Sequence, residues 1–287
     1  MKKSLLVIGL VIFSLQPVAF AALKPSMISV MSWNILGPSA KDAQDFFPRV
    51  KKPDQYDRLS KIAEKIILVD PLILCLQEVD KKSLNILSSL LHTYIPVAYK
   101  SQNKNGGVVV YVKKNAFDLQ LTIEVDLHGK GVAAGALFTF KKTGTQLLVC
   151  SIHISRNNAF NNANIKEGEK QLEILMKKLT ELIPHLKNSA CILAGDFNAN
   201  SSEISGSTLS FLESITHKKY QDSLPNQITA NRPDGTPSSI DHILYSDLIF
   251  IEEESYVGKM DFEHSPLIHK QYPSDHLPIY CQFKENK

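Results

Sequence analysis

The sequence predicts an α/β fold, a four-layer α/β sandwich in which two mixed β-sheets pack face to face with helices outside. Three observations favour this fold class. Apolar runs of strand length recur along the chain, four segments carry apolar residues at helical spacing, and hairpins mix with strand–helix–strand units. Because no linker, low-complexity tract or internal repeat divides residues 22–287, we expect them to form one domain.

The first half of the chain alternates expected strands with two helices. Asp70-Pro71 ends the first helix, and Asn105-Gly106 is typical of a hairpin turn. The strands are expected at residues 27–34, 72–77, 108–112, 119–125, 132–140 and 147–154, and the helices at 57–69 and 82–91.

The second half contains the clearest helix, over residues 165–186. An apolar stripe runs along it, formed by Leu172, Leu175, Met176, Leu179, Leu182, Ile183 and Leu186. At about 1.5–3 kcal/mol each, these seven side chains would contribute on the order of 10–20 kcal/mol of burial before the entropy cost, which is enough to fix the helix against a sheet. Strands at 190–194, 239–244 and 278–283 and a helix at 208–217 complete the expected fold.

The N-terminal residues are typical of an export signal. Lys2 and Lys3 are basic, residues 5–15 form an apolar stretch of 11 residues, and Ala19-Phe20-Ala21 fits a small-x-small cleavage site. The stretch is shorter than the roughly 20 residues that span a bilayer. We therefore expect a signal peptide over residues 1–21 and a protein that is exported, either periplasmic or secreted. A membrane anchor is the alternative interpretation.

Charge and cysteine content narrow the class of protein further. The formal net charge is +3, and without Lys2 and Lys3 it is +1 (3 − 2), which argues against a tight binder of duplex nucleic acid. The four cysteines lie inside apolar runs, so we expect core packing rather than disulfides. None of them has the spacing of a zinc site.

Acidic and imidazole side chains stand beside apolar runs. The three strings that carry them are Leu76-Gln77-Glu78, Gly195-Asp196-Phe197-Asn198 and Ser274-Asp275-His276. A carboxylate partly removed from water is costly unless it is compensated, and carboxylates gathered at one rim repel one another. A divalent cation compensates them, and clusters rich in oxygen suit Mg²⁺ or Mn²⁺.

Six motifs follow one another along the chain, each at the end of an expected strand. They are Trp33-Asn34, Leu76-Gln77-Glu78, Ile152-His153, Gly195-Asp196-Phe197-Asn198, residues 240–244 (IDHIL) and residues 274–278 (SDHLP). Together they resemble the endonuclease/exonuclease/phosphatase superfamily, the DNase I-like phosphoesterases. Tyr56-Asp57-Arg58, Gln77-Glu78-Val79-Asp80 and residues 232–236 (RPDGT) further resemble its deadenylase and nocturnin branch. The resemblance covers essentially all of residues 22–287.

The resemblance implies a metal site made by three residues. Glu78 would be the first ligand, Asn34 would contribute its amide oxygen, and Asp275 would bind the metal directly or through water. A rim carboxylate paired with a lysine is the alternative for Glu78, and a turn-forming asparagine is the alternative for Asn34.

The same resemblance implies the hydrolytic roles. Asp196 would orient or deprotonate the attacking water, and Asn198 would hold that water or a phosphate oxygen. Residues i and i+2 of a continuing strand face the same side, so both could reach one phosphate. His276 would touch the scissile phosphate as base or stabiliser, while Asp241 would fix its tautomer and raise its pKa. His153 would be a second phosphate contact. The alternatives are an Asx turn at Asp196 and a core or capping role for His276.

Two cations are candidates for substrate binding, Arg156 and Lys130. Their alternative role is that of solvated surface charges. The resemblance implies an arginine near the position of Lys130, and a lysine there lacks the bidentate fork of a guanidinium.

We therefore expect an exported, Mg²⁺- or Mn²⁺-dependent hydrolase of phosphodiester bonds, a nuclease or nucleotide phosphodiesterase. Its phosphoester substrate would be single-stranded nucleic acid or nucleotides, and we expect a monomer without a stable membrane span. Two alternatives stay open. A lipid phosphoesterase of the sphingomyelinase or inositide phosphatase type would share the chemistry, although no exposed aromatic-rich hairpin is evident. A binding protein that has lost catalysis would keep only the fold.

Overall fold

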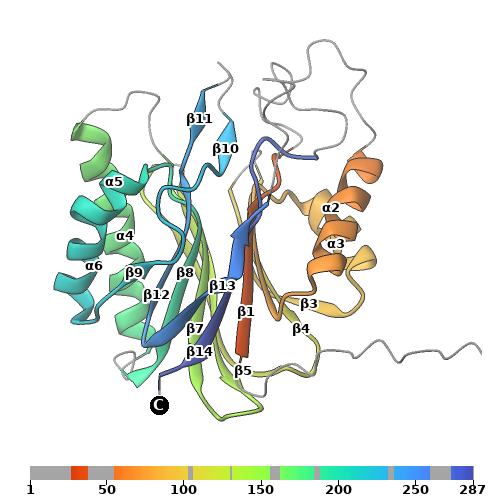
Figure 1. Cartoon of the computed structure of the whole chain (residues 1–287), viewed down its shortest axis with the longest axis horizontal. Coiled ribbons are helices and arrows are strands. Elements are labelled where there is room, and N and C mark those ends of the chain that lie inside the picture. The colour runs from red at the N-terminus through yellow and green to blue at the C-terminus, as the bar shows by residue number, and fades with distance from the viewer. Residues whose placement is uncertain are drawn as a thin grey trace, which may run out of the picture.

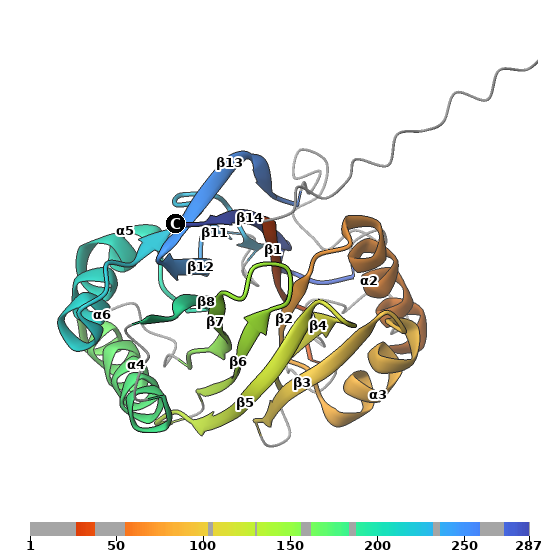
Figure 2. The ribbon, with the colours of Figure 1, turned by 90° about the horizontal axis from the view of Figure 1, so that it is seen from below.

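The computed structural model describes residues 27–37, 55–102, 106–129, 131–155, 162–183, 188–231, 236–258 and 273–286. Within these ranges the chain forms the predicted four-layer sandwich, with two sheets face to face and helices on both outer sides (Figure 1, Figure 2). The fold class expected from the sequence is therefore confirmed.

Each of the two large sheets has six strands within the described ranges, and both are mixed. The first sheet contains, in order, β13 (Leu248–Val257), β14 (Ile279–Glu285), β1 (Met27–Asn34), β2 (Ile73–Gln77), β4 (Gly107–Lys113) and β3 (Tyr94–Ser101). The second contains β5 (Phe117–Asp126), β6 (Val132–Phe140), β7 (Gln146–His153), β8 (Ala190–Asp196), β12 (Asp241–Ser246) and β9 (Gln221–Asp222). A small hairpin of β10 (Ala230–Asn231) and β11 (Pro237–Ser238) stands at the top of Figure 1.

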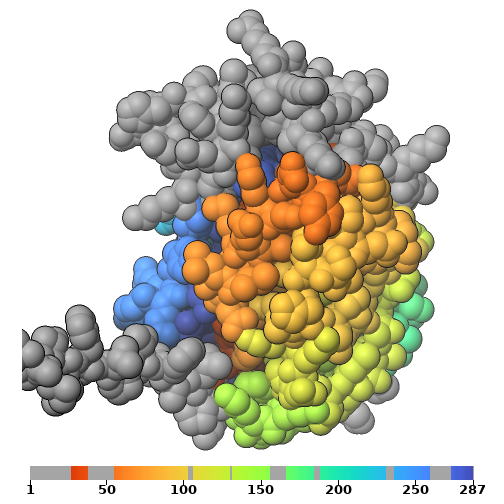
Figure 3. Space-filling model, turned by 90° about the vertical axis from the view of Figure 1, so that its right-hand side faces the viewer, coloured from red at the N-terminus to blue at the C-terminus, as the bar shows by residue number. Residues whose placement is uncertain are grey.

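The helices cover the outer faces of the sheets. α2 (Gln55–Val69) and α3 (Lys81–Leu90) lie on the first sheet, on the side of the molecule that Figure 3 presents. α4 (Asn162–Leu182) and α6 (Leu209–Thr216) lie on the second sheet, and the short α5 (Ser201–Glu203) and a π-helical turn (Ile204–Thr208) lead into α6. Apolar stripes on the helices pack against one face of each sheet, so each sheet is buried on both sides.

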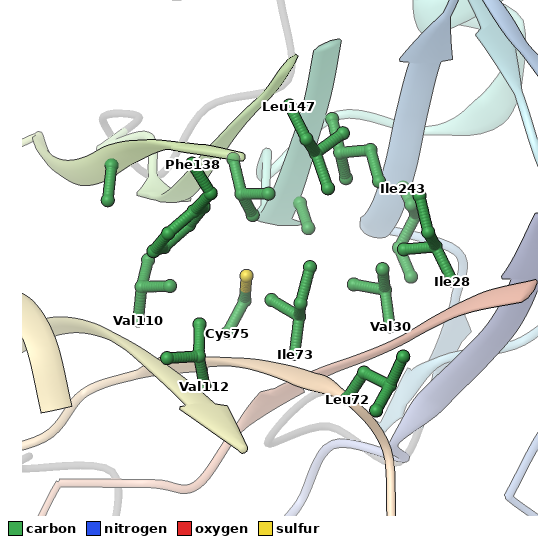
Figure 4. Close-up of a cluster of buried hydrophobic side chains, with 14 of the residues drawn as sticks. Ile28, Val30, Leu72, Ile73, Cys75, Val110, Val112, Phe138, Leu147 and Ile243 are labelled. Atoms are coloured by element: carbon green, nitrogen blue, oxygen red, sulfur yellow. The ribbon is translucent and has the colours of Figure 1, made fainter. Parts of the chain in front are cut away.

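The central core fills the layer between the sheets. In Figure 4, Val30 and Ile73 of the first sheet face Leu147 and Ile243 of the second. Successive side chains of a strand point to opposite faces, so these residues recur at every second position. All four cysteines, each within the described residues, are buried and unpaired, which confirms the expectation of core packing.

Three expectations need correction. The strands β3 and β13 were not among the expected elements. Leu182 was placed in the apolar stripe of the long helix, but it is the last residue of that helix and 37% of it is exposed. The long helix begins and ends earlier than expected, at Asn162 and Leu182.

Some expectations fall on residues that the structure does not describe. These are the signal peptide, the substrate cations Lys130 and Arg156, the turn residue Asn105, and Leu186 of the helical stripe. Among the helices in the described ranges, none combines the length and hydropathy needed to cross a bilayer.

Candidate active site

Strand ends from both sheets meet at one rim of the sandwich. β7 and β8 run parallel, so their carboxyl ends place His153 beside Asp196. Asn34 ends β1 in the other sheet, and its hydrogen bond to Asp196 shows that the two sheets bring these ends to the same rim. β12 runs antiparallel to β8, which places Asp241, the first residue of β12, opposite Asp196. β14 runs antiparallel to β1, so the residues just before it, Asp275 and His276, reach the same rim.

The rim side chains continue the face that lines the central core. Ile192 and Ala194 of β8 lie between the sheets, and Asp196 follows them on the same face. Asn34 follows Val30 in the same way on β1, and Asp241 precedes Ile243 on β12. The site is therefore the polar end of the inter-sheet layer.

Asn34 joins two of the expected acidic residues. Its Nδ2 donates to Oε1 of Glu78 at 3.1 Å and to Oδ2 of Asp196 at 3.1 Å, and its Oδ1 accepts the N–H of Leu36 at 3.1 Å. Glu78 also accepts the N–H of Gly37 through Oε2 at 2.7 Å. In this arrangement Asn34 offers its nitrogen to the carboxylates, so ligation through its oxygen would require the amide to turn over.

The backbone of Glu78 is held in an uncommon conformation. Its φ of 59° lies in the left-handed region, which costs energy for a residue with a side chain. A Cβ placed on Gly106 would lie 2.7 Å from the carbonyl carbon of Glu78, so only glycine allows the start of β4 to approach this closely. The N–H of Val79 bonds the carbonyl of Gly107 at 2.9 Å. This contact between β4 and the chain after β2 fixes the direction of the Glu78 side chain.

His276 forms a buried pair with Asp241. Nδ1 of His276 lies 2.8 Å from Oδ2 of Asp241, and Nε2 lies 3.9 Å from Oδ2 of Asp196. Burial lowers the pKa of His276, but the carboxylates of Asp241 and Asp275 raise it more, and its pKa lies well above the usual value. The carboxylates therefore favour the charged form of the ring, and an imidazolium suits the stabilisation of charge on a phosphate.

Asp196 lies at the centre of the rim and is 2% exposed. Burial and the neighbouring charge of Asp241 raise its pKa, and the two imidazoles of His276 and His153 oppose that rise. Nε2 of His153 lies 3.8 Å from Oδ2 of Asp196, and Nδ1 of His153 is buried without a hydrogen-bond partner among the described residues.

Asn198 reaches the rim by a different route from the one expected. The expectation of a continuing strand was wrong, because β8 ends at Asp196 and Asn198 has a left-handed φ of 48°. The N–H of Asn198 donates to Oδ1 of Asp196 at 2.8 Å, which is the Asx turn named as the alternative. Its Nδ2 donates to the carbonyl of Ile154 at 2.8 Å. The turn leaves Oδ1 of Asn198 as the polar atom that could meet a water or a substrate.

Asp275 is a buried carboxyl whose charge is poorly compensated. Burial, with the charge of Glu78 in addition, raises its pKa to about 6, while His276 acts in the opposite direction. Ser274 Oγ lies 3.4 Å from its Oδ1. The guanidinium of Arg58 influences it from nearby, but Arg58 donates to the carbonyls of Ile35, Leu36 and Pro273.

The donor set fits a divalent cation. Ligand atoms of Asp196, Asp241 and His276 lie within 4.8 Å of one another, the one such group among the described residues. Because Asp241 already engages Nδ1 of His276, the carboxylates are the ligands that this group offers to a cation. Glu78 and Asp275 add two carboxylates on the side of the first sheet. Because Asp196 and Asp275 both have raised pKa values, a cation that compensates their charge would be bound favourably.

Thr229 positions two of the rim residues and was missed from the sequence. Its Oγ1 accepts the N–H groups of Ile240 and Asp241 at 3.1 and 3.0 Å, and its carbonyl accepts the N–H of Leu277 at 2.6 Å. The next residue, Ala230, forms a β-bridge with His276. A threonine in a loop gives no periodic signal, so nothing in the sequence marked it.

Arg58 links the chain segment that follows Asn34 to the segment that precedes Asp275, because its guanidinium donates to backbone carbonyls in both. It is 8% exposed, and burial lowers its pKa. Its position on α2 did carry a signal, because it lies four residues before Ile62 on the apolar face of that helix.

Comparison with known proteins identifies the family and the fold. The model of the Endonuclease/Exonuclease/phosphatase family matches residues 31–276, and the chain belongs to this family of phosphoester hydrolases. Mouse nocturnin is 26% identical over 91% of this chain, which spans 66% of the mouse protein, just under two thirds of its length. The human nocturnin catalytic domain with bound sulfate has a TM-score of 0.64 at 22% identity, covering 92% of this chain and 96% of that one. ANGEL2, described as a 2′,3′-cyclic phosphatase in complex with adenosine-2′,3′-vanadate, has a TM-score of 0.67 at 17% identity, covering 91% and 96%.

Proposed function

We propose that the protein is a divalent-metal-dependent hydrolase of phosphodiester bonds, a nuclease or nucleotide phosphodiesterase. The observation that carries the proposal is the meeting of Asp196 with the His276–Asp241 pair, at 3.9 and 2.8 Å, beside Glu78 and Asn34. This set combines an acceptor for a water proton, a buried positive charge and acidic oxygens for a cation.

The protein side chains divide the chemistry among them. Asp196, fixed by the N–H of Asn198, would orient and deprotonate the attacking water. The imidazolium of His276, held by Asp241, and the ring of His153 would stabilise negative charge on the equatorial phosphate oxygens. No side chain is required to form a covalent intermediate.

Glu78, Asp275 and Asn34 are the proposed metal ligands, with Asp241 and Asp196 close by. A bound Mg²⁺ or Mn²⁺ would polarise the phosphate and stabilise the leaving oxygen. The raised pKa values of Asp196 and Asp275 support this, because cation binding would hold both groups in their charged forms at neutral pH.

Nucleotides or single-stranded nucleic acid are the proposed substrates. Support comes from relatives: nocturnin is similar in sequence, and ANGEL2 is similar in fold and binds an adenosine-2′,3′-vanadate. The near-neutral net charge of residues 22–287 agrees with a short substrate better than with a long duplex.

The test uses bis-p-nitrophenyl phosphate with the purified protein. We expect turnover with Mg²⁺ or Mn²⁺ and loss of turnover with EDTA, restored by excess metal. Turnover that continues unchanged in EDTA would refute the mechanism. A panel of single-stranded RNA and DNA, duplex DNA, mononucleotides, sphingomyelin and inositol phosphates then separates a nuclease from a lipid phosphoesterase. Failure on every member of the panel would favour a binding protein without catalysis.

We also propose that residues 1–21 direct export and that the exported chain is a monomer. Lys2 and Lys3, the apolar residues 5–15 and Ala19-Phe20-Ala21 support export. Expression of the full chain in a bacterium, followed by fractionation and N-terminal sequencing, tests this proposal. A chain that stays in the cytoplasm with its first 21 residues intact would contradict it. Light scattering of the exported form tests the monomer.

A further inference from the structure

A second buried histidine–aspartate pair lies one residue further along β12 than Asp241. Nδ1 of His242 lies 2.8 Å from Oδ2 of Asp222 on β9, and Nε2 lies 2.8 Å from the carbonyl oxygen of Ala199. His242 is 1% exposed and points to the helical side of the sheet, away from the rim. The ring is therefore held through both of its nitrogens, by a side chain of β9 on one side and by a backbone carbonyl on the other.

The carbonyl that His242 holds belongs to the turn after Asp196. The ring of Phe197 packs edge-on against the His242 ring, with centroids 5.9 Å apart and planes at 80°. Between Phe197 and Ala199 lies Asn198, whose N–H donates to Oδ1 of Asp196 at 2.8 Å. His242 therefore contacts the residue before Asn198 and the residue after it, and the N–H of Asn198 orients the Asp196 carboxylate.

We propose that His242, anchored by Asp222, is a positioning residue that clamps the turn of residues 197–200 and thereby sets the orientation of Asp196. Two contacts hold the turn around the left-handed φ of 48° at Asn198: Nδ2 of Asn198 donates to the carbonyl of Ile154, and His242 bonds the carbonyl of Ala199, the next residue. The effect of the clamp on catalysis rests on the proposed function, whereas its effect on the turn does not.

Two substitutions distinguish the two hydrogen bonds that the His242 ring makes. An asparagine places its amide nitrogen near the position of Nδ1, and a glutamine places its nitrogen near Nε2. His242→Gln can therefore keep the bond to Ala199, and His242→Asn can keep only the bond to Asp222. We expect His242→Asn to lower kcat about tenfold with KM little changed, because a misplaced Asp196 weakens the chemical step more than binding. His242→Gln should stay within about threefold of the native kcat.

The control variant is Leu244→Ala. Leu244 lies on the same face of β12 and is fully buried, but its apolar side chain has no group that could hydrogen-bond the turn after Asp196. The substitution should lower the melting temperature and leave kcat nearly unchanged. A loss of kcat in Leu244→Ala as large as in His242→Asn would overturn the proposal, since stability alone would then explain the effect.

Hydrogen exchange supplies a readout that needs no activity. In a peptide that covers residues 197–200, His242→Asn should exchange faster than the native protein, whereas His242→Gln should not. Equal exchange and equal kcat in the two variants would overturn the clamp. If His242→Asn fails to fold, Asp222→Asn, which removes the anchoring charge, should show the same faster exchange; native protection there would overturn the proposal. An inactive native protein would refute the proposed function, while the exchange measurement would still test the clamp.

Discussion

The layer between the sheets has two ends that follow the same geometric rule and have opposite chemistry. On β8, Ile192 and Ala194 fill the central core, and Asp196 continues the same face at the rim. On β1, Val30 lies in the core and Asn34 at the rim. Strand alternation alone decides which side chains enter the layer, and the residue type decides whether the layer becomes core or site.

The two ends of the layer contribute to folding stability in opposite ways. The apolar end gains free energy from removing apolar surface from water. The polar end carries buried carboxyls, and the raised pKa values of Asp196 and Asp275 record the cost of charging them there. We therefore expect substitutions at the apolar end to affect stability and substitutions at the polar end to affect binding and turnover.

The largest expected effect is at the apolar end. Ile192→Ala removes a fully buried side chain and should lower the free energy of unfolding by about 4 kcal/mol, within the range of core truncations. Urea denaturation measures this loss. Activity per folded molecule should stay near that of the native protein, and a large loss of kcat in the folded fraction would break the separation between the two ends.

At the polar end, Asp275→Asn should stabilise the metal-free protein. Because burial raises the folded pKa of Asp275 to about 6 from the usual 3.8, the stability linked to this group is fully present below pH 4 and is lost as the pH rises through about 6. The difference between the folded and the usual pKa corresponds to a loss of about 3 kcal/mol in the free energy of unfolding at neutral pH. An uncharged asparagine at this position would not cause that loss.

Denaturation in EDTA at pH 5 and pH 8 measures this effect. The native protein should lose stability relative to Asp275→Asn between the two values. The same variant should bind Mn²⁺ more weakly, as calorimetry would show. A variant that is less stable than the native protein at pH 8 without metal would contradict the assigned cost.

Asp196→Ala and His276→Ala remove the groups proposed to act on water and phosphate. Each should lower kcat by about 10²-fold or more, equivalent to about 2.7 kcal/mol in the barrier. Steady-state kinetics on bis-p-nitrophenyl phosphate measures the loss, with circular dichroism as the control for folding. A folded variant with full activity would eliminate that residue from the mechanism.

The smallest expected effect is at Thr229, which holds the backbone of Asp241. Thr229→Val removes the hydroxyl acceptor of two N–H groups and should lower kcat about tenfold, whereas Thr229→Ser should retain most of it. Thr216→Val is the matched control, because Thr216 Oγ1 also accepts a backbone N–H, that of Lys218, at the end of α6. Equal losses of kcat in Thr229→Val and Thr216→Val would show that Thr229 has no positioning role in catalysis.

The sequence was sufficient for the fold and for the strand ends that carry polar residues. Periodicity indicated most strands and helices, and the motif order brought Asn34, His153 and Asp196 to the correct ends of β1, β7 and β8. β3 was not predicted because it is an edge strand with Pro96 beside a bulge. β13, the strand at the other edge of the same sheet, was not predicted because the acidic residues 252–254 interrupt its apolar pattern.

Side-chain direction within the rim could not be predicted from the sequence. The left-handed conformations of Glu78 and Asn198 depend on contacts with Gly106 and Ile154, which are distant along the chain. The direction of the Asn34 amide depends on Leu36 and on two carboxylates from other strands. Such details follow from tertiary contacts, which local pattern does not encode.

The central claim is that side chains from both sheets form one cation site at the polar end of the layer. A crystal soaked in Mn²⁺, with its anomalous scattering measured at the manganese edge, tests it most directly. We expect a peak beside the carboxylates of Glu78 and Asp275, within reach of Asn34. A crystal with no peak at this rim, or with manganese bound only elsewhere on the molecule, would contradict the account.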